Sequence, residues 1–370
     1  MKMNCVSLAV CFLIAAMSFT PAIAGTWTVT NLNPAGVPSS TAHGVSGSQQ
    51  VGNASIGGSD HASLWSGTSG SWVDLNPAGA TASSAGDISG GKQAGYAVID
   101  GVNHAGVWNG TAASWVDLHP AGAQQSYING ISNSMQAGYI QSSGGYLHAC
   151  KWNGTAASFV DLAPAGSTNS EALGIADNQQ VGFAAISVGG HYNNHASLWF
   201  GSSVSWRDLN PAGASSSFAL GIYNGYYPDV VGYAYVNGDQ CHASRWFTGT
   251  ATSWVDLNPS WADWSVASGN YGSYQVGYAG IYGSGKHAGI WSGSAASWQD
   301  LSDYLPTGAY TDSCADGVYV SGDNIYVIGW GVKADGTNDA LLWTWSVPEP
   351  SGIFALLGGL GTLVAFRKRR

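Results

Sequence analysis

The sequence predicts an all-β protein: a seven-bladed β-propeller whose ring is closed by its N-terminal strand. Three observations predict this fold. Two short aromatic motifs alternate along the chain, and successive copies of the first lie 43 to 48 residues apart. Each period contains four strand-like segments separated by Gly, Asn, Ser or Asp. The last period lacks its fourth segment, and the N-terminus supplies one. Seven periods of four strands are typical of a propeller.

The first motif is an aromatic residue, any residue, Asp and Leu, usually followed two residues later by Pro. Its copies begin at Trp72, Trp115, Phe159, Trp206, Trp254 and Trp298, and a degenerate copy begins at Trp27. The second motif is His-Ala-x-x-Trp. Its copies begin at His61, His104, His148, His195, His242 and His287, and Asp339 replaces the His in the seventh. Because Trp recurs at fixed positions in both motifs, we expect these side chains to be packed within the fold.

One period shows the expected strands. They are Ala85–Ser89, Gln93–Ile99, His104–Trp108 and Ser114–Leu118. Their lengths suit strands, and no stretch keeps an apolar period of 3.6 residues. We expect the first strand of each blade to crowd near the axis, where small residues are needed. The small residues at these matched positions are Gly44, Gly86, Gly130, Gly174, Gly221 and Gly317.

The two ends of the repeat region predict how the ring closes. The strand Thr26–Leu32 has no preceding partner, and the final repeat stops after Leu341–Trp345 without an outer strand. Pairing these two segments would complete the seventh blade from both chain ends. It would also remove two exposed sheet edges, which are an aggregation liability.

Residues 1–24 have the three parts of a secretory signal peptide. Lys2 provides a basic start, an apolar stretch follows from Val6 to Phe19, and Ala22-Ile23-Ala24 forms a small-residue site. We expect signal peptidase to cut before Gly25. The exported body is then residues 25–346, and residues 347–370 form a separate tail.

The tail combines a short motif, an apolar run and a basic end. The motif is Val347, Pro348, Glu349 and Pro350, the apolar run is 352–366, and the basic end is Arg367, Lys368, Arg369 and Arg370. A membrane span needs roughly 17–25 residues, so this run is marginal as a permanent anchor. The terminal cations are expected to stay in the cytoplasm. An ordinary tail anchor is the alternative.

These parts, in this order, resemble the sorting tail of PEP-CTERM proteins. The resemblance implies an exosortase partner in an exopolysaccharide-producing Gram-negative bacterium. It also implies a transient inner-membrane anchor through a C-terminal hydrophobic helix, followed by delivery to the cell surface or extracellular matrix. The repeat itself is similar to the HAF repeat of extracellular bacterial proteins, although Ser, Gly, Cys or Leu stands where that family has Phe. That resemblance implies no catalytic activity.

Composition excludes one class of partner. Only 9% of the residues are charged, and the body alone carries 6 Lys and Arg against 20 Asp and Glu. So acidic a body repels phosphate backbones, and we expect no nucleic-acid partner. The body has three cysteines, Cys150, Cys241 and Cys314. Burial as small side chains is the preferred interpretation, and a disulfide between two of them stays open.

The repeated polar residues are expected to be structural. Equivalent His residues on six different blades cannot converge on one ion, so we expect each to make a hydrogen bond inside its blade. The motif Asp residues are expected to cap turns before the Asn-Pro sequences. They are Asp74, Asp117, Asp161, Asp208, Asp256 and Asp300.

Residues that break the repeat are better candidates for a specific site. Tyr226, Tyr227, Trp261 and Trp264 interrupt the pattern and are candidates for stacking on sugar rings, with packing under longer loops as the alternative. Asp335, Asn338 and Asp339 lie in a Gly-containing loop with oxygen ligands that suit Ca²⁺, although their spacing favours a plain turn. No other metal or cofactor is expected.

The sequence contains no motif of the common hydrolases, metalloenzymes or phosphate-binding enzymes. We therefore predict that the chain is not an enzyme, but a secreted binding or scaffolding module of the cell surface or matrix, with polysaccharide as a candidate ligand. Two alternatives stay open. One is a carbohydrate-active propeller enzyme that uses an Asp pair, and the other is a purely structural matrix component.

Overall fold

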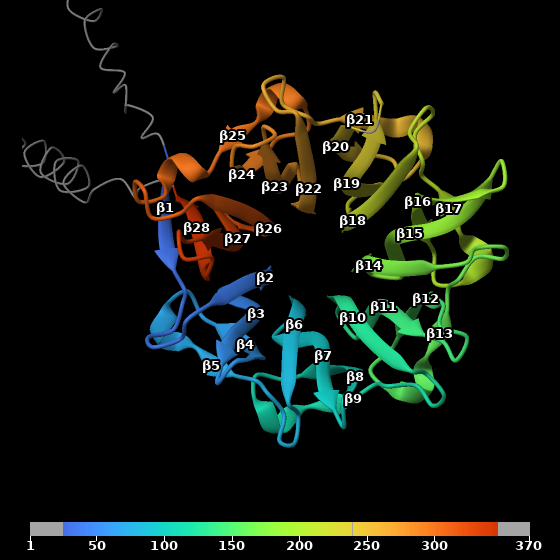
Figure 1. Cartoon of the computed structure of the whole chain (residues 1–370), viewed down its shortest axis with the longest axis horizontal. Helices are drawn as coiled ribbons and strands as arrows, with labels where there is room; N and C mark the ends of the chain where they lie inside the picture. Colours follow the sequence, from blue (N-terminus) through green and yellow to red (C-terminus); the bar gives the residue numbers. More distant parts are fainter. Residues whose placement is uncertain (1–24, 239, 347–370) are drawn as a thin grey trace, which may run out of the picture. The chain divides into compact units, whose positions relative to one another are not determined.

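The computed structural model describes residues 25–238 and 240–346. Within Trp27–Trp345, seven four-stranded antiparallel sheets surround a central channel (Figure 1). The predicted all-β seven-bladed propeller is confirmed. The predicted signal peptide and the predicted sorting tail, with its motif, apolar helix and basic end, lie outside the described residues. In the described part of the chain, no helix has the length and apolarity to cross a membrane.

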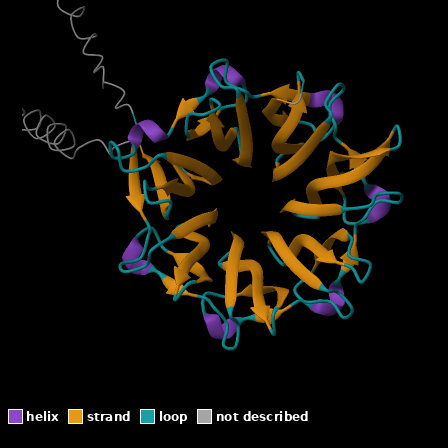
Figure 2. Cartoon of the chain, viewed as in Figure 1, coloured by secondary structure: helices purple, strands orange, loops and turns teal. Residues whose placement is uncertain are grey.

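Each blade begins at the channel and steps outward strand by strand (Figure 2). The innermost strands are β2 (Ser40–Ser46), β6 (Ala82–Ser89), β10 (Gln125–Ser132), β14 (Ser170–Ala176), β18 (Ser216–Asn224), β22 (Trp264–Tyr271) and β26 (Asp312–Ser321). The second strands are β3 (Gln49–Ile56), β7 (Lys92–Ile99), β11 (Met135–Gln141), β15 (Gln179–Val188), β19 (Pro228–Val236), β23 (Tyr274–Gly280) and β27 (Asn324–Val332).

The outer half of each blade holds the two sequence motifs. The third strands are β4 (Ser59–Trp65), β8 (Val102–Trp108), β12 (Leu147–Trp152), β16 (His191–Trp199), β20 (Gln240–Trp246), β24 (Lys286–Trp291) and β28 (Asn338–Ser346). The outermost strands are β5 (Val73–Asp74), β9 (Val116–Asp117), β13 (Val160–Asp161), β17 (Arg207–Asp208), β21 (Trp254–Asp256), β25 (Gln299–Asp300) and β1 (Thr26–Asn31). Short 3₁₀ helices precede six of them: η1 (Ser69–Ser71), η2 (Ala112–Ser114), η3 (Ala156–Ser158), η4 (Ser203–Ser205), η5 (Ala251–Ser253) and η6 (Ala295–Ser297). A further one, η7 (Ser302–Tyr304), follows β25.

Both ends of the described chain build the seventh blade. Its strand order is β1, β28, β27, β26, so the N-terminal strand lies outside the last strand of the chain. The Leu32 N–H donates to the Ala340 carbonyl at 2.8 Å. The Thr28 hydroxyl donates to the Thr344 carbonyl at 3.4 Å. The predicted ring closure is confirmed.

Two details of the strands differ from prediction. The outermost strands pair over only two or three residues in six blades, because the 3₁₀ turn before each motif occupies Ser114 and its equivalents. The innermost strands each contain a β-bulge, and in β6 the residue after the bulge is Asp87, paired with Ala94. Asp87, and not Gly86, therefore matches Gly44. In the sixth blade the residue at this matched position is Gly269, which the sequence analysis had not included.

Small residues next to the bulges allow neighbouring innermost strands to approach closely. A Cβ on Gly317 would lie 3.2 Å from the His43 carbonyl oxygen, and a Cβ on Gly44 would lie 2.8 Å from Asp87 Cα. The same contact recurs around the ring, since a Cβ on Gly269 would lie 2.6 Å from the Asp316 carbonyl oxygen. The expectation that the strands crowd near the axis is correct.

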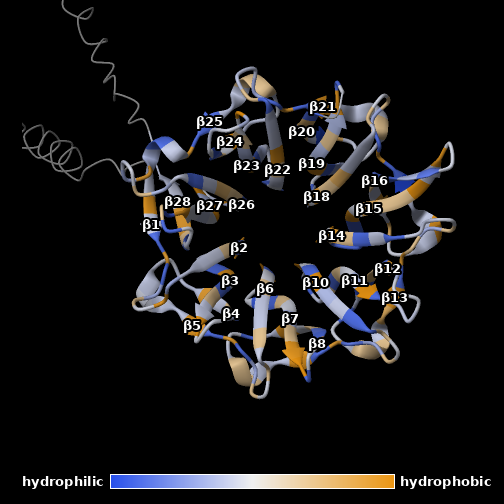
Figure 3. Cartoon of the chain, viewed as in Figure 1, coloured by the Kyte–Doolittle hydropathy of each residue, from blue (hydrophilic) through white to orange (hydrophobic). Residues whose placement is uncertain are grey.

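Apolar side chains fill the gaps between blades and do not gather in one central core. Figure 3 shows hydrophobic residues distributed around the whole ring. Between the first two blades, Trp108 packs with Leu64 and Leu75 of the preceding blade. The third-strand Trp of every blade is at most 1% exposed. Burying such a side chain stabilises the fold by several kcal/mol at about 25 cal/mol per Å². The motif Trp residues are fold residues, as expected.

Each gap between blades also holds one buried serine. The Ser83 hydroxyl accepts the Ala62 N–H of the preceding blade at 2.9 Å and donates to Asn76 Oδ1 at 2.7 Å. The equivalent bond from a third-strand Ala N–H exists at all seven junctions. Its serines are Ser40, Ser83, Ser126, Ser170, Ser217, Ser265 and Ser313. A polar group in an apolar gap thus links every blade to the next.

The strand order gives the ring two distinct faces. Strands alternate in direction, so turns between second and third strands share one face with the connections between blades; we call this the connection face. Turns between first and second strands share the other face with η1 to η6, and we call this the helix face. The two faces are built from different loops and can carry different sites.

Replacing Ser83 with Ala tests the buried serine. The Ala62 N–H and Asn76 Oδ1 would both lose their partner in a buried gap, so we expect a loss of about 1–3 kcal/mol in the free energy of unfolding. Urea unfolding measures it. The exposed Ser66, replaced with Ala, is the matched control and should change stability by less than about 0.5 kcal/mol. Equal effects of the two substitutions would contradict the role of Ser83.

Candidate functional site

The repeated His and Asp residues form six pairs, one within each of the first six blades. His195 Nδ1 lies 2.8 Å from Asp208 Oδ2, and the other pairs are 2.6 to 2.8 Å apart. The second oxygen of the same Asp accepts a backbone N–H two residues later, which in this blade belongs to Asn210. One carboxylate therefore anchors the His and caps the turn. The sequence predicted both bonds, but not that they share one carboxylate.

In the seventh blade, Asp339 takes the place of His and finds other partners. Lys333 Nζ donates to it at 2.9 Å, Asn31 Nδ2 at 2.9 Å and the Tyr310 hydroxyl at 3.1 Å. The calcium hypothesis for Asp335, Asn338 and Asp339 remains a prediction. Asp335 accepts the N–H and hydroxyl of Thr337 within its own turn, and Asn338 donates its N–H to Ser39. Among residues 25–238 and 240–346, no group of three His, Cys, Asp or Glu side chains is arranged to hold a metal ion.

The three cysteines of the body are free thiols. Cys150 and Cys314 are buried, and Cys241 is half-buried. Burial raises the pKa of Cys241 and of Cys314 to about 12. These thiols therefore stay protonated at neutral pH, which disfavours nucleophilic chemistry.

The four aromatic candidates lie on opposite faces of the ring. Tyr226 and Tyr227 follow the end of β18 on the helix face, where they are 93% and 58% exposed and contact each other. Trp261 lies in the connection that precedes β22, on the connection face, and is 43% exposed. Trp264 begins β22 and packs on Tyr278. The structure does not bring the four together as one site.

Trp261 is part of a group that the sequence did not reveal, formed with Tyr282 and His287 of the same blade. We call these three residues the blade-6 platform. Tyr282 is 66% exposed in the turn between β23 and β24. Its N–H donates to Asp263 Oδ2 at 2.9 Å, which ties this turn to the connection that carries Trp261. The Trp261 ring centroid lies 6.3 Å from that of His287.

The platform borders a pocket of about 290 Å³ between β25 and β26, which His287 and Asp312 line. His287 Nδ1 is bound to Asp300 at 2.6 Å, so the ring is held in one orientation. Among the described residues, His287 Nε2 has no hydrogen-bond partner, and the side chain is 45% exposed. An aromatic face, a fixed polar ring nitrogen and an adjacent pocket thus meet on the connection face.

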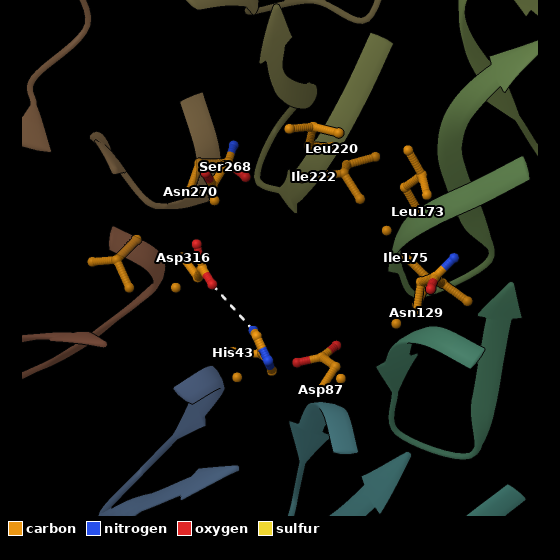
Figure 4. Close-up of a pocket in the computed structure, with 18 of the residues that line it drawn as sticks. His43, Asp87, Asn129, Leu173, Ile175, Leu220, Ile222, Ser268, Asn270 and Asp316 are labelled. Carbon is orange, nitrogen blue, oxygen red and sulfur yellow. Dashed lines mark hydrogen bonds and ion pairs between the residues drawn. The ribbon is translucent and has the colours of Figure 1, made fainter. Parts of the chain in front are cut away.

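A second group lies in the central channel, and the sequence analysis missed it. Figure 4 shows His43 between Asp316 and Asp87. His43 Nδ1 lies 3.1 Å from Asp316 Oδ2, which joins the first blade to the seventh. His43 Nε2 lies 3.0 Å from Asn53 Oδ1. Asp87 accepts the N–H groups of Ile88 and Ile131 at 2.8 and 2.9 Å, so it bridges the second and third blades.

Burial and hydrogen bonding shift the pKa values of two channel residues. Burial opposes the charged form of His43, but the hydrogen bond and charge of Asp316, helped by Asn53, outweigh it and raise the pKa. Burial raises the pKa of Asp87 to about 6, against the opposing effect of its two backbone N–H donors. The raised pKa favours the charged form of His43, in which both ring nitrogens can donate to their acceptors.

The signal that could have found this group is the variable position before the innermost Gly. Each bulge directs that residue to the channel, and it differs from blade to blade while the flanking residues recur. Around the ring it is His43, Gly86, Asn129, Leu173, Leu220, Ser268 and Asp316. Aligning Gly86 with Gly44 obscured this column, because it shifted the second repeat by one residue.

Comparisons with known proteins bear on the fold. No protein-family model matches the chain, and no curated protein matches it. A puromycin hydrolase structure is similar with a TM-score of 0.53 at 10% identity, covering 84% of this chain and 54% of that one. The acylaminoacyl peptidase of Pyrococcus horikoshii has a TM-score of 0.53 at 10% identity, with 92% and 56% covered. This chain spans about half the length of these solved chains.

These similarities correct one prediction. The sequence predicted that the chain is not an enzyme, because it contains no motif of the common enzyme classes. Solved structures that share its fold are nevertheless peptidases and hydrolases, including a Mycobacterium tuberculosis puromycin-hydrolyzing peptidase with a TM-score of 0.50 at 11% identity, covering 86% of this chain and 56% of that one. Neither the propeller nor its repetition therefore excludes an enzyme. At this identity the likeness shows the fold alone.

Asp87 should make stability depend on pH. Its folded pKa of about 6 exceeds the ordinary 3.8, so its contribution is full below pH about 4 and is lost as pH rises through about 6. Relative to Asp87→Gly, the wild-type free energy of unfolding should fall by up to about 3 kcal/mol from pH 4 to pH 7. Urea unfolding at both pH values measures this difference, and a constant difference would refute it.

Proposed function

We propose that this chain is an exported binding module of the cell surface or extracellular matrix, and that it holds polysaccharide on the blade-6 platform. The sorting steps rest on the sequence: a signal peptide cut by signal peptidase, and a tail that resembles an exosortase substrate. The ligand class rests on the platform. Both parts are testable separately, because the tail and the platform are far apart in the sequence.

The geometry of Trp261 is the observation that carries the proposal. Its ring is held by Trp298 at a centroid distance of 6.0 Å and yet leaves 43% of the side chain in solvent. A rigid, exposed aromatic face suits the apolar face of a sugar ring and costs little conformational entropy on binding. His287 Nε2 and Asp312 supply polar groups for sugar hydroxyls beside it.

The platform is also open to the side, which suits a polymer. It lies on the connection face, where Tyr146, in the turn before β12, and Tyr192, near the start of β16, are also more than half exposed. A chain that crosses this face meets aromatic residues on several blades. Repeated weak contacts along one polymer increase the apparent affinity without a deep pocket.

One observation favours the alternative of a carbohydrate-active enzyme that uses an Asp pair. Asp87, whose pKa is raised by burial, and Asp316 lie in one channel, and such enzymes use two carboxyl groups, one of them a general acid with a raised pKa. However, the cavity there is about 200 Å³. Cavities of about 150 Å³ hold one benzene ring, so this space does not hold two sugars on either side of a bond. We therefore favour binding on the platform.

The platform is tested by Trp261→Ala. Loss of the stacking face should weaken binding of the purified protein to the exopolysaccharide of the producing cells by about tenfold. Co-sedimentation with the isolated polysaccharide measures the affinity. Tyr226→Ala removes an exposed aromatic from the helix face and should bind like the wild type. Unchanged binding by the Trp261 variant, or an equal loss in the control, would refute the platform.

The sorting tail is tested by replacing Pro348, Glu349 and Pro350 with Ala. If the motif directs processing, the variant should stay in the membrane fraction while the wild type reaches the surface or the medium. Immunoblots of fractionated cells measure this distribution. Ser66→Ala, a remote exposed substitution, should leave it unchanged. If the variant is released as the wild type is, the motif does not direct processing of the tail.

A further inference from the structure

The cavity in the central channel has two chemically different sides. All seven innermost strands line it, with a volume of about 200 Å³. Asp316, His43 and Asp87 lie on one side, on the adjacent strands β26, β2 and β6. Leu173 and Leu220 lie on the other side, on the adjacent strands β14 and β18. Figure 4 shows the two groups facing each other across the channel.

The polar side offers a ligand hydrogen-bond acceptors. Asp316 Oδ2 is bound to His43, but Asp316 Oδ1 has no hydrogen-bond partner among the described residues. Both ring nitrogens of His43 are bound, so His43 offers a ligand no free donor. Asp87 and Asp316 give this side two carboxyl groups beside one imidazole. No Lys or Arg lines the cavity in the described part of the chain.

The apolar side departs from the repeat at the bulge position. Five of the seven bulge residues are polar or Gly, whereas β14 and β18 place Leu173 and Leu220 there. Both Leu side chains remain half-buried at the channel. Apolar surface left in contact with channel water is unfavourable, and a ligand's hydrocarbon part that covers it recovers about 25 cal/mol per Å².

Volume limits the ligand to a small molecule. An engineered protein cavity of about 150 Å³ accepts benzene, which has six heavy atoms. The channel cavity therefore fits a molecule of roughly six to eight heavy atoms. Such a ligand spans from the acceptor side to the leucines, provided that it is cationic at one end and hydrocarbon at the other.

We propose that this cavity binds a short-chain alkylammonium ion. The ammonium group donates to Asp316 Oδ1 and lies near Asp87, and the alkyl chain packs on Leu173 and Leu220. The site is distinct from the blade-6 platform, and its ligand is a small solute. Because Asp316 and His43 belong to the last and first blades, the bound cation also lies beside the junction where the ring closes.

Isothermal titration calorimetry of the purified protein at neutral pH tests the site with n-pentylammonium chloride. The matched probes are 1-pentanol, which is neutral, and sodium pentanoate, which is anionic. We expect saturable binding of n-pentylammonium, at least about tenfold weaker binding of the alcohol and no binding of the anion. Equal binding of alcohol and ammonium, or no binding of the ammonium, overturns the proposal without any variant.

Three variants assign the binding to the cavity. Asp316→Asn and Leu220→Asn should each weaken n-pentylammonium binding by about tenfold or more. Asp208→Asn, a matched change in a His–Asp pair at the perimeter, should bind as the wild type does. Asp87→Gly introduces the residue that the other six blades have at this position. It replaces Asp316→Asn in the test if that variant fails to fold, and it should also weaken binding. Binding that survives the cavity substitutions, or falls equally in the perimeter control, overturns the assignment.

Discussion

The hydrogen bond between each innermost serine and the preceding blade is the interaction on which this ring depends. The gaps between blades are otherwise filled mainly by apolar side chains, which attract without direction. In two gaps the buried indole N–H groups of Trp291 and Trp343 also donate to carbonyls of the preceding blade. A single hydroxyl in each gap, such as that of Ser83, binds only when the two sheets stand in one register. Because the bond is buried, misplacing it leaves an unpaired N–H at a cost of about 1–3 kcal/mol. Apolar packing thus provides the stability, and the serine selects the arrangement.

Ring closure follows from the same interaction. Ser40 accepts the Ala340 N–H, so the first blade is joined to the seventh by the bond that joins all the others. The outer strand β1 adds backbone pairing, and His43 with Asp316 adds an ion pair at the channel. Ring closure is therefore stabilised at three distances from the axis: at the channel, in the gap between the blades and at the outer strand. A ring built in this way has no open sheet edge at the junction, and its frame is fixed independently of the residues at loop tips and bulges.

Particular residues show how far the sequence could predict this structure. The period of the Trp motifs predicted the blades, and the unpaired strand Thr26–Leu32 predicted closure, because both depend on local pattern and chain order. The junction serines were missed because Ser is common in this chain and the bond joins different repeats. Trp261 was recognised as an interruption, but Tyr282 was not, since only folding brings its turn beside that connection. Tyr226 could not be assigned to the opposite face without strand direction.

The channel residues show a different limit. A repeat is recognised by what recurs, whereas a ligand site in a ring requires equivalent positions to differ. In six blades the bulge places a side chain toward the axis, and in the second blade, whose bulge residue is Gly86, the following residue Asp87 lines the channel instead. Identical residues on all seven blades would give a symmetric surface that distinguishes no part of a ligand. His43, Asp87 and Asp316 on one side and two leucines on the other break this symmetry. Selectivity for a ligand in such a fold therefore depends on positions that do not recur, which a search for repeats ignores. The recurring His–Asp pairs most resemble a catalytic motif, but they hold turns in place.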